Sequence, residues 1–177
     1  LGDIGPEAGM PVMEGKCALF KALAGVDAIP LCIRSKDVSE IVRTVELLAG
    51  SFGGINLEDI AAPRCMEIER QLKQKCDIPV FHDDQHGTAI VVAAALINAC
   101  KLTGKSVSAL RVAINGAGAA ALAIARLLLS LGVPDIVLCD KFGLLYEGNP
   151  DMNSEQAMVA RLTNPRNVRG RLRDAVA

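Results

Sequence analysis

Short apolar runs alternate along the chain with segments in which apolar residues have the spacing of a helix. From Val38 to Leu48 they recur at i, i+3, i+4 and i+7, which is typical of an amphipathic helix that packs on a core by one face. The apolar run at 26–33, just before this segment, predicts a strand. The pattern therefore predicts a strand followed by a helix as its first unit.

The same order of strand and helix recurs up to residue 140. The predicted strands are residues 26–33, 53–57, 78–81, 110–115 and 136–139, and the predicted helices are residues 38–48, 63–75, 88–102 and 119–131. Strands that alternate with helices pair in parallel and carry helices on their faces, so we expect an α/β fold with parallel open sheets and flanking helices. A boundary near Gly104 to Ser108 would separate a segment 1–104 from a domain 105–177.

Two of the predicted strands end in adjacent acidic residues, Glu58 with Asp59 and Asp83 with Asp84. Ligands of an open α/β sheet bind beyond the carboxyl ends of the strands, and neighbouring strands lie about 4.8 Å apart. Four carboxylates that gather there repel one another and favour a bound cation, for which oxygen ligands indicate Mg²⁺ or Mn²⁺. The alternative is that an aspartate caps the next helix, while Glu58 and Asp59 are solvated loop charges.

His82 and His86 flank the second acidic pair. Two histidines four residues apart face one way only on a helix, whereas these span the expected turn from strand to helix. No cysteine has the spacing that would complete a zinc site. We therefore expect both histidines to line the site as polar residues.

A glycine-rich turn separates a strand from a helix in the second half of the chain. It reads Gly116-Ala117-Gly118-Ala119-Ala120-Ala121, a G-x-G-x-x-A pattern. Gly116 permits the tight turn, Gly118 lets a pyrophosphate approach the helix N-terminus, and Ala121 allows close packing of helix on strand. A close crossing without ligand would use the same turn, but strand, turn, helix and a terminal acid together favour a Rossmann-like dinucleotide-binding domain.

The terminal acid of this unit is Asp140, which follows Ala121 by 19 residues. An acid at this place accepts a hydrogen bond from the adenosine ribose and repels a 2′-phosphate. NAD is therefore the predicted cofactor, and NADP stays open because Lys141 follows directly.

Composition narrows the class of protein. The 177 residues are 51% hydrophobic with a net charge of −1, which suits a globular core and gives no sign of a nucleic-acid or lipid partner. Asn98 and Arg126 interrupt the longest apolar stretches, so no membrane span is predicted. The six cysteines form no C-x-x-C pair and mostly lie in apolar runs, which predicts small buried side chains in the reducing cytoplasm. The arginines at 166, 169, 171 and 173 are expected to line a solvated face.

The acidic segment followed by the glycine-rich segment resembles bacterial-type malic enzymes. The similar stretches, in the same order over nearly the whole chain, are LGDIG, EGKCALFKALAG, GGINLEDIAAPRC, IPVFHDDQHGTAIV and NGAGAAALAIARLLL. The resemblance implies oxidative decarboxylation of malate to pyruvate and CO₂, with NAD(P) and with Mg²⁺ or Mn²⁺. It also implies a homo-oligomer whose partner is the small molecule malate.

The resemblance also implies roles for single residues. Glu58, Asp59 and Asp84 would bind the metal, and Asp83 beside them would help to orient the catalytic groups. Lys16, in EGKCALF, matches the catalytic lysine of the family, which takes the proton of the C2 hydroxyl while hydride leaves for nicotinamide. Without the motif, Lys16 and Lys21 are both ordinary, solvated helix lysines.

Other features of that family are missing from these 177 residues. Malic enzymes also use a tyrosine acid and a substrate-binding arginine before LGDIG, and asparagines after the first half of the Rossmann domain; Tyr146 does not match that tyrosine. We therefore expect a central fragment of a larger enzyme, inactive by itself. The alternatives are a non-oxidative malolactic or oxaloacetate decarboxylase and a catalytically incompetent nucleotide-binding module.

Overall fold

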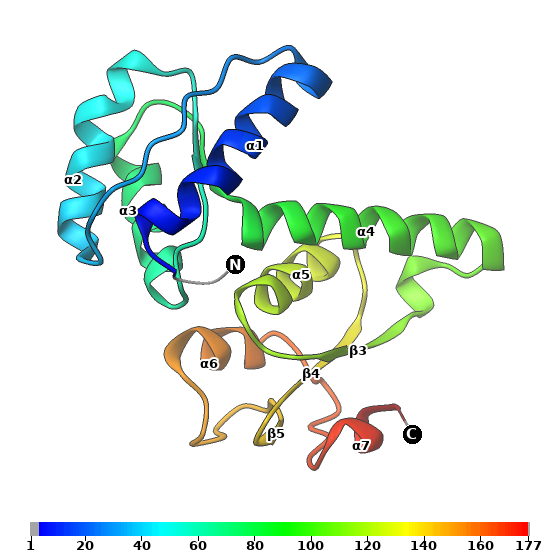
Figure 1. The fold of residues 1–177 in the computed structure, drawn as a ribbon. Helices are drawn as coiled ribbons and strands as arrows, with labels where there is room; N and C mark the ends of the chain where they lie inside the picture. Colours follow the sequence, from blue (N-terminus) through cyan, green and yellow to red (C-terminus); the bar gives the residue numbers. More distant parts are fainter. Residues whose placement is uncertain (1–3, 177) are drawn as a thin grey trace. The chain divides into compact units, whose positions relative to one another are not determined.

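Residues 4–176, which the computed structural model describes, form helices and short strands (Figure 1). By their internal contacts these residues form two units that meet between Phe81 and His82. The first unit contains α1 (Pro6–Ala24), α2 (Val38–Leu48), the 3₁₀ turn η1 (Ala49–Ser51), β1 (Ile55–Leu57), α3 (Arg64–Lys75) and most of β2 (Val80–His82). The second unit contains α4 (Asp83–Thr103), the 3₁₀ turn η2 (Val107–Ala109), β3 (Arg111–Asn115), α5 (Ala119–Ser130), β4 (Asp135–Asp140), β5 (Gly143–Leu144), α6 (Ser154–Ala160) and α7 (Leu172–Val176).

The core of the first unit joins α2 and α3 to the two-stranded sheet of β1 and β2. Its buried members are Ile41, Val42, Val45, Leu57, Ile68, Leu72 and Val80. The α2 helix begins after Asp37, whose carboxylate accepts a hydrogen bond from the Glu40 amide at 2.9 Å. The hydroxyl of Ser39 and this amide hold the pKa of Asp37 below its usual range. The structure thus confirms the helix predicted at 38–48, which has an acidic N-cap and buries its apolar residues on one face.

The strand predicted at 26–33 is wrong, because the structure has no strand between α1 and α2. A strand needs a neighbour for its backbone hydrogen bonds, and within residues 4–176 none pairs with this segment. Pro30 also removes a donor from the middle of the run. Ile29 and Leu31 are 65% and 50% exposed, whereas Ile33 packs against the first core.

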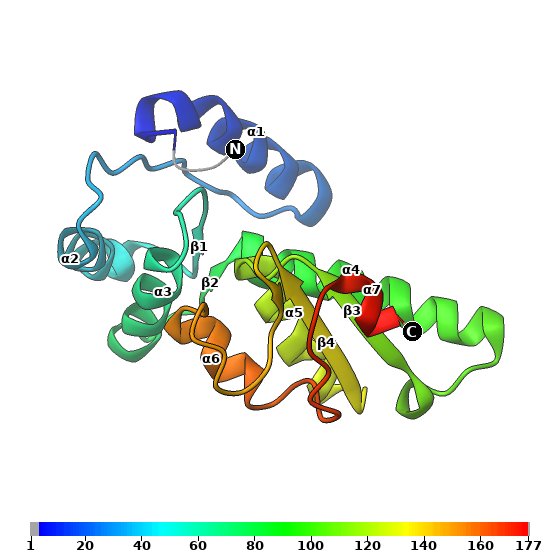
Figure 2. The same ribbon diagram turned by 90° about the horizontal axis from the view of Figure 1, so that it is seen from below.

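The second unit is built on a sheet with the order β3-β4-β5 in the described part of the chain. Figure 2 shows β3 beside β4. β3 pairs in parallel with β4, with Arg111 opposite Asp135 and Asn115 opposite Cys139, while the short β5 is antiparallel. Val137 and Cys139 pack with Ala175 of α7, so strand alternation turns Ile136 and Leu138 to the opposite face. Helices on the sheet and the parallel β3–β4 pair confirm the predicted α/β class.

The α4 helix begins at Asp83, five residues earlier than predicted, and ends before Gly104, which adopts φ +68° as a left-handed C-cap. It packs along α5, and both helices belong to the second unit. The predicted domain boundary near Gly104 to Ser108 stays a prediction. By length and composition α4 is also apolar enough to cross a membrane, as are core helices of soluble proteins. The expected lack of a membrane span therefore stays a prediction.

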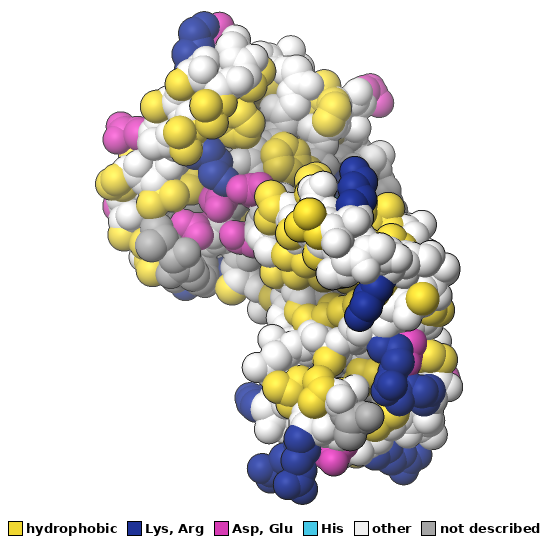
Figure 3. All heavy atoms as spheres, turned by 90° about the vertical axis from the view of Figure 1, so that its right-hand side faces the viewer, with side chains coloured by type: hydrophobic (Ala, Val, Ile, Leu, Met, Phe, Trp, Pro, Cys, Tyr) yellow, Lys and Arg dark blue, Asp and Glu magenta, His cyan; other side chains and the backbone are white. Residues whose placement is uncertain are grey.

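The surface carries scattered hydrophobic side chains among charged ones (Figure 3). On α4 the most exposed are Ile90, Val91 and Leu102, at 61%, 64% and 89%. The arginines at 166, 169, 171 and 173 are exposed, which confirms the solvated face. The guanidinium of Arg169 stacks 4.5 Å from the centre of the Tyr146 ring, so this tyrosine supports the local packing.

All six cysteines are free thiols. Cys65, Cys100 and Cys139 are buried as predicted, whereas Cys17, Cys32 and Cys76 are only partly buried. Burial raises the pKa of the Cys76 thiol, and the carboxylates of Glu46 and Asp77 raise it further. Cys76 is therefore a protonated, unreactive thiol at neutral pH.

Candidate active site

The two lysines of α1, which the sequence could not separate, have different surroundings. The ammonium group of Lys16 contacts the carboxylate of Glu58, and these side chains are only 21% and 11% exposed. Lys21 is 62% exposed and pairs at 2.7 Å with Asp27, which is itself exposed. Lys16 is thus the lysine that α1 directs to an acidic residue at the end of β1.

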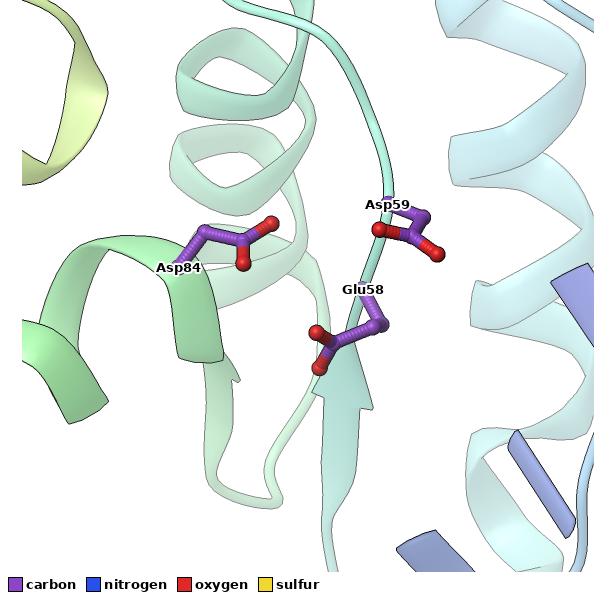
Figure 4. Close-up of side chains that lie close together, drawn as sticks. All are labelled: Glu58, Asp59 and Asp84. Carbon is purple, nitrogen blue, oxygen red and sulfur yellow. The ribbon is translucent and has the colours of Figure 1, made fainter. Parts of the chain in front are cut away.

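Three carboxylates come together at the ends of β1 and β2. Glu58, Asp59 and Asp84 each offer an oxygen atom, and these atoms all lie within 4.8 Å of one another (Figure 4). Glu58 and Asp59 follow β1 directly, and Asp84 lies in the first turn of α4, which continues without a loop from β2. Because β2 pairs with β1, Asp84 is carried at the end of the same sheet.

The backbone of Asp59 explains how two consecutive residues reach one site. Successive side chains of an extended chain point to opposite sides, which would separate Glu58 from Asp59. Asp59 adopts φ +52°, in the left-handed region that few residues other than glycine occupy. This reversal ends the strand geometry and lets both carboxylates contribute oxygen atoms to the group.

The second acidic pair divides between two surroundings. Asp84 belongs to the group of three carboxylates, whereas Asp83 does not, although both lie in the first turn of α4. Their charges favour the positive N-terminal end of that helix. His82 is fully buried with its Nδ1 4.0 Å from an oxygen of Asp84, and His86 is partly buried.

The donor set fits a divalent cation of the Mg²⁺ or Mn²⁺ type. Glu58, Asp59 and Asp84 supply oxygen atoms only, which these hard cations prefer. Three carboxylates in so small a space also repel one another. A bound cation would relieve this repulsion.

The glycine-rich turn joins β3 to α5, and its glycines leave the start of α5 open. Gly116 adopts φ +111°, which a residue with a side chain avoids. Gly118 is the N-cap of α5, and a side chain there would meet nothing within 4 Å. Since a glycine N-cap has no side chain to cap the helix, the first amides of α5 are left for an anion such as a pyrophosphate.

Asp140 is the last residue of β4, and both of its carboxylate oxygens accept hydrogen bonds. Oδ1 accepts a hydrogen bond from the Lys141 amide at 2.8 Å, and Oδ2 accepts one from Nε2 of Gln156 at 2.6 Å. The same Nε2 also donates to the carbonyl of Ala117 at 3.1 Å. Gln156, which is buried, therefore ties the acid to the glycine-rich turn.

Gln156 was not predicted as a site residue from the sequence, although a local signal was present. Asn153 and Gln156 form a capping box, in which each side chain bonds the other residue's backbone at the start of α6. An N-cap asparagine with glutamine at N3 predicts such a helix start. Contact with Asp140, which lies 16 residues away, follows from the tertiary fold alone.

Comparison with known proteins finds family matches in both halves of the chain. Residues 1–37 and 34–73 match the model of the malic enzyme N-terminal domain, and residues 85–176 match that of the malic enzyme NAD binding domain. The chain therefore belongs to the malic enzyme family, an oxidoreductase family whose members use a nicotinamide dinucleotide.

Similar proteins include bacterial malic enzymes that depend on different cofactors. The chain is 58% identical to the bifunctional malic/malolactic enzyme of Bacillus subtilis, over 99% of this chain and 43% of that protein. It is 52% identical to the NAD-dependent malic enzyme of Geobacillus stearothermophilus, over 100% of this chain and 37% of that protein. The NADP-dependent malic enzyme of Halomonas elongata is 48% identical, over 95% of this chain and 40% of its own length.

A solved structure has the same fold. The NAD-dependent malic enzyme of Thermotoga maritima superposes with a TM-score of 0.95 at 48% identity, over 99% of this chain and 47% of that one. The chain thus spans less than half the length of the relatives that it matches.

Proposed function

We propose that the protein that carries this sequence oxidises and decarboxylates malate to pyruvate and CO₂, with reduction of NAD and with Mg²⁺ or Mn²⁺. The observation that supports this proposal most directly is the set of Glu58, Asp59 and Asp84 within 4.8 Å, with Lys16 against Glu58. A lone acidic group would be common on any surface. A lysine held at such a group, in a chain that also has the dinucleotide turn, fits an alcohol oxidation that needs a base, a cation and a hydride acceptor.

Each site residue has its own role in the proposed reaction. A divalent cation held by Glu58, Asp59 and Asp84 supplies polarisation of the substrate oxygens, and nicotinamide supplies a hydride acceptor. Lys16, when unprotonated, takes the proton of the C2 hydroxyl at Nζ while the C2 hydride leaves. Asp83, which precedes Asp84 in the sequence, orients the catalytic groups.

The dinucleotide lies on the second unit in this proposal. The amides of the first turn of α5 bind the pyrophosphate, for which Gly116 and Gly118 provide the backbone and the space. Asp140, held by Gln156, accepts hydrogen bonds from the adenosine ribose. We also propose that the protein is a homo-oligomer and that it lies in the cytoplasm. Its free cysteines support the cytoplasmic location.

The function predicts a metal-dependent reaction in the full-length protein. With malate and NAD we expect NADH and pyruvate to form in equal amounts when Mn²⁺ is present, and the rate to fall to background when a chelator removes it. Absorbance at 340 nm together with chromatographic analysis of the products measures both. Turnover that is unchanged by the chelator would contradict the role of the carboxylates.

A malolactic reaction is the second candidate, because the Bacillus subtilis relative at 58% identity is named a bifunctional malic/malolactic enzyme. This reaction gives lactate and CO₂ from malate without net reduction of the dinucleotide. The same product analysis distinguishes it, since lactate would accumulate in excess of NADH.

Asp140 is predicted to set the preference between cofactors. A 2′-phosphate beside this carboxylate is repelled, and like charges in contact cost several kcal/mol, so we expect NADH to bind at least about tenfold more tightly than NADPH. Asp140→Asn should remove most of that difference, whereas Asp151→Asn, an exposed acid of the same unit, should keep it. Fluorescence titration with both reduced cofactors measures the ratio. A wild-type preference for NADPH would mean that Lys141 or another group outweighs Asp140.

A further inference from the structure

Gly87 is an unfavourable residue for the helix in which it lies. It is the fifth residue of α4, a helix that is otherwise rich in alanine and other good helix formers. Glycine is among the least favourable residues inside a helix, because it loses the most backbone freedom on folding. Gly87 has no positive φ that would require glycine.

The space that a side chain at position 87 would fill is taken by Asp83. In an α-helix each Cα–Cβ bond tilts toward the N-terminus, so a Cβ at position 87 points at residue 83, one turn earlier. Such a Cβ would lie far inside van der Waals contact with Oδ1 of Asp83 and 3.1 Å from its Cγ. The three atoms nearest to that position all belong to the Asp83 carboxyl group.

The position of the Asp83 carboxylate over Gly87 accounts for the division of the acidic pair. Asp83 and Asp84 are adjacent in the first turn of α4, yet only Asp84 joins Glu58 and Asp59. With its carboxylate over residue 87, Asp83 leaves that group with three oxygen ligands instead of four. A residue with any side chain at 87 would exclude this conformation.

We propose that Gly87 is a positioning residue of the active site: the absence of a side chain at 87 leaves open the space in which the Asp83 carboxylate lies, outside the group of three metal ligands. The inference rests on the proposed function for the role of Asp83. In this inference Gly87 acts through Asp83, the residue whose carboxyl group occupies the place of a Cβ at 87.

A double-mutant cycle in the full-length protein tests this inference. Misplacing a catalytic group by about 1 Å can cost about 100-fold in rate, so we expect Gly87→Ala to lower kcat by about 10- to 100-fold. Asp83→Ala should have a similar effect, and the double variant should be no slower than Asp83→Ala within about twofold, because both changes remove one function. Effects that multiply, or a Gly87→Ala variant with normal kcat, would overturn the inference.

Two further measurements exclude a loss of folding as the cause. Alanine favours a helix more than glycine does, so Gly87→Ala should unfold at a temperature no lower than wild type. Calorimetric titration should find its Mn²⁺ affinity within about threefold of wild type, since Glu58, Asp59 and Asp84 are intact. Gly50→Ala, where a Cβ meets nothing within 4 Å, is the matched control and should keep normal kcat.

A crystal structure of Gly87→Ala separates failure of this inference from failure of the proposed function. If the wild-type protein does not turn over malate, this result contradicts the proposed function but not the inference about Gly87. An Asp83 carboxylate that still lies over residue 87 in the variant would overturn the inference whatever the activity, and a displaced carboxylate with an unchanged α4 backbone would support it.

Discussion

Lys16→Ala in the full-length protein is expected to lower kcat for malate oxidation by about 1000-fold, since a positioned general base contributes about 100- to 10,000-fold. Lys16→Ala removes the amine that takes the hydroxyl proton in the proposed reaction. Binding of NADH, measured by fluorescence, should be unchanged. Mn²⁺ affinity should be no weaker than in wild type, because the ammonium of Lys16 competes with a cation for Glu58.

The matched control is Lys21→Ala, five residues further along the same helix. Lys21 is exposed and pairs with a solvated aspartate, so this ion pair contributes little and kcat should stay within about twofold. Malate-dependent formation of NADH at saturating malate and Mn²⁺ measures both variants. A Lys16→Ala variant that keeps more than about a tenth of wild-type kcat would remove this residue from the role of base.

Asp84→Ala is expected to weaken Mn²⁺ binding by about 100-fold, which corresponds to about 2.7 kcal/mol. Two unit charges 4 Å apart at an effective dielectric constant of about 20 interact by about 4 kcal/mol, so the loss of one carboxylate remains large after a water molecule replaces it. Calorimetric titration of the full-length protein with Mn²⁺ measures the change. Unchanged affinity would exclude Asp84 as a ligand.

The adjacent Asp83→Ala variant is the control for this prediction. Both substitutions remove one negative charge from the first turn of α4, so a general electrostatic effect would weaken Mn²⁺ binding equally in the two variants. Since only Asp84 belongs to the group of three oxygen atoms, we expect Asp83→Ala to keep Mn²⁺ affinity within about threefold while it lowers kcat. Equal losses in both variants would contradict the assignment of Asp84, but not Asp83, as a ligand.

The sequence by itself determined the elements that depend on nearby residues. The α2 helix was predicted with its bounds, because apolar spacing and a capping aspartate act within a few residues. The turn at Gly116 was equally predictable, since its backbone conformation is a property of glycine. The acidic pairs after two strands indicated a shared site, because parallel strands end at the same edge of a sheet.

The tertiary structure alone decided which of several similar residues or segments makes contacts with distant parts of the chain. Residues 26–33 read as a strand but pair with none in the described chain, since hydrogen bonds between strands need a partner distant in sequence. Lys16 and Lys21 have the same local sequence character, and only the packing of α1 gives Lys16 an acidic neighbour from β1. Gln156 reaches Asp140 only because α6 folds back toward the end of β4, a contact between residues that no local pattern connects.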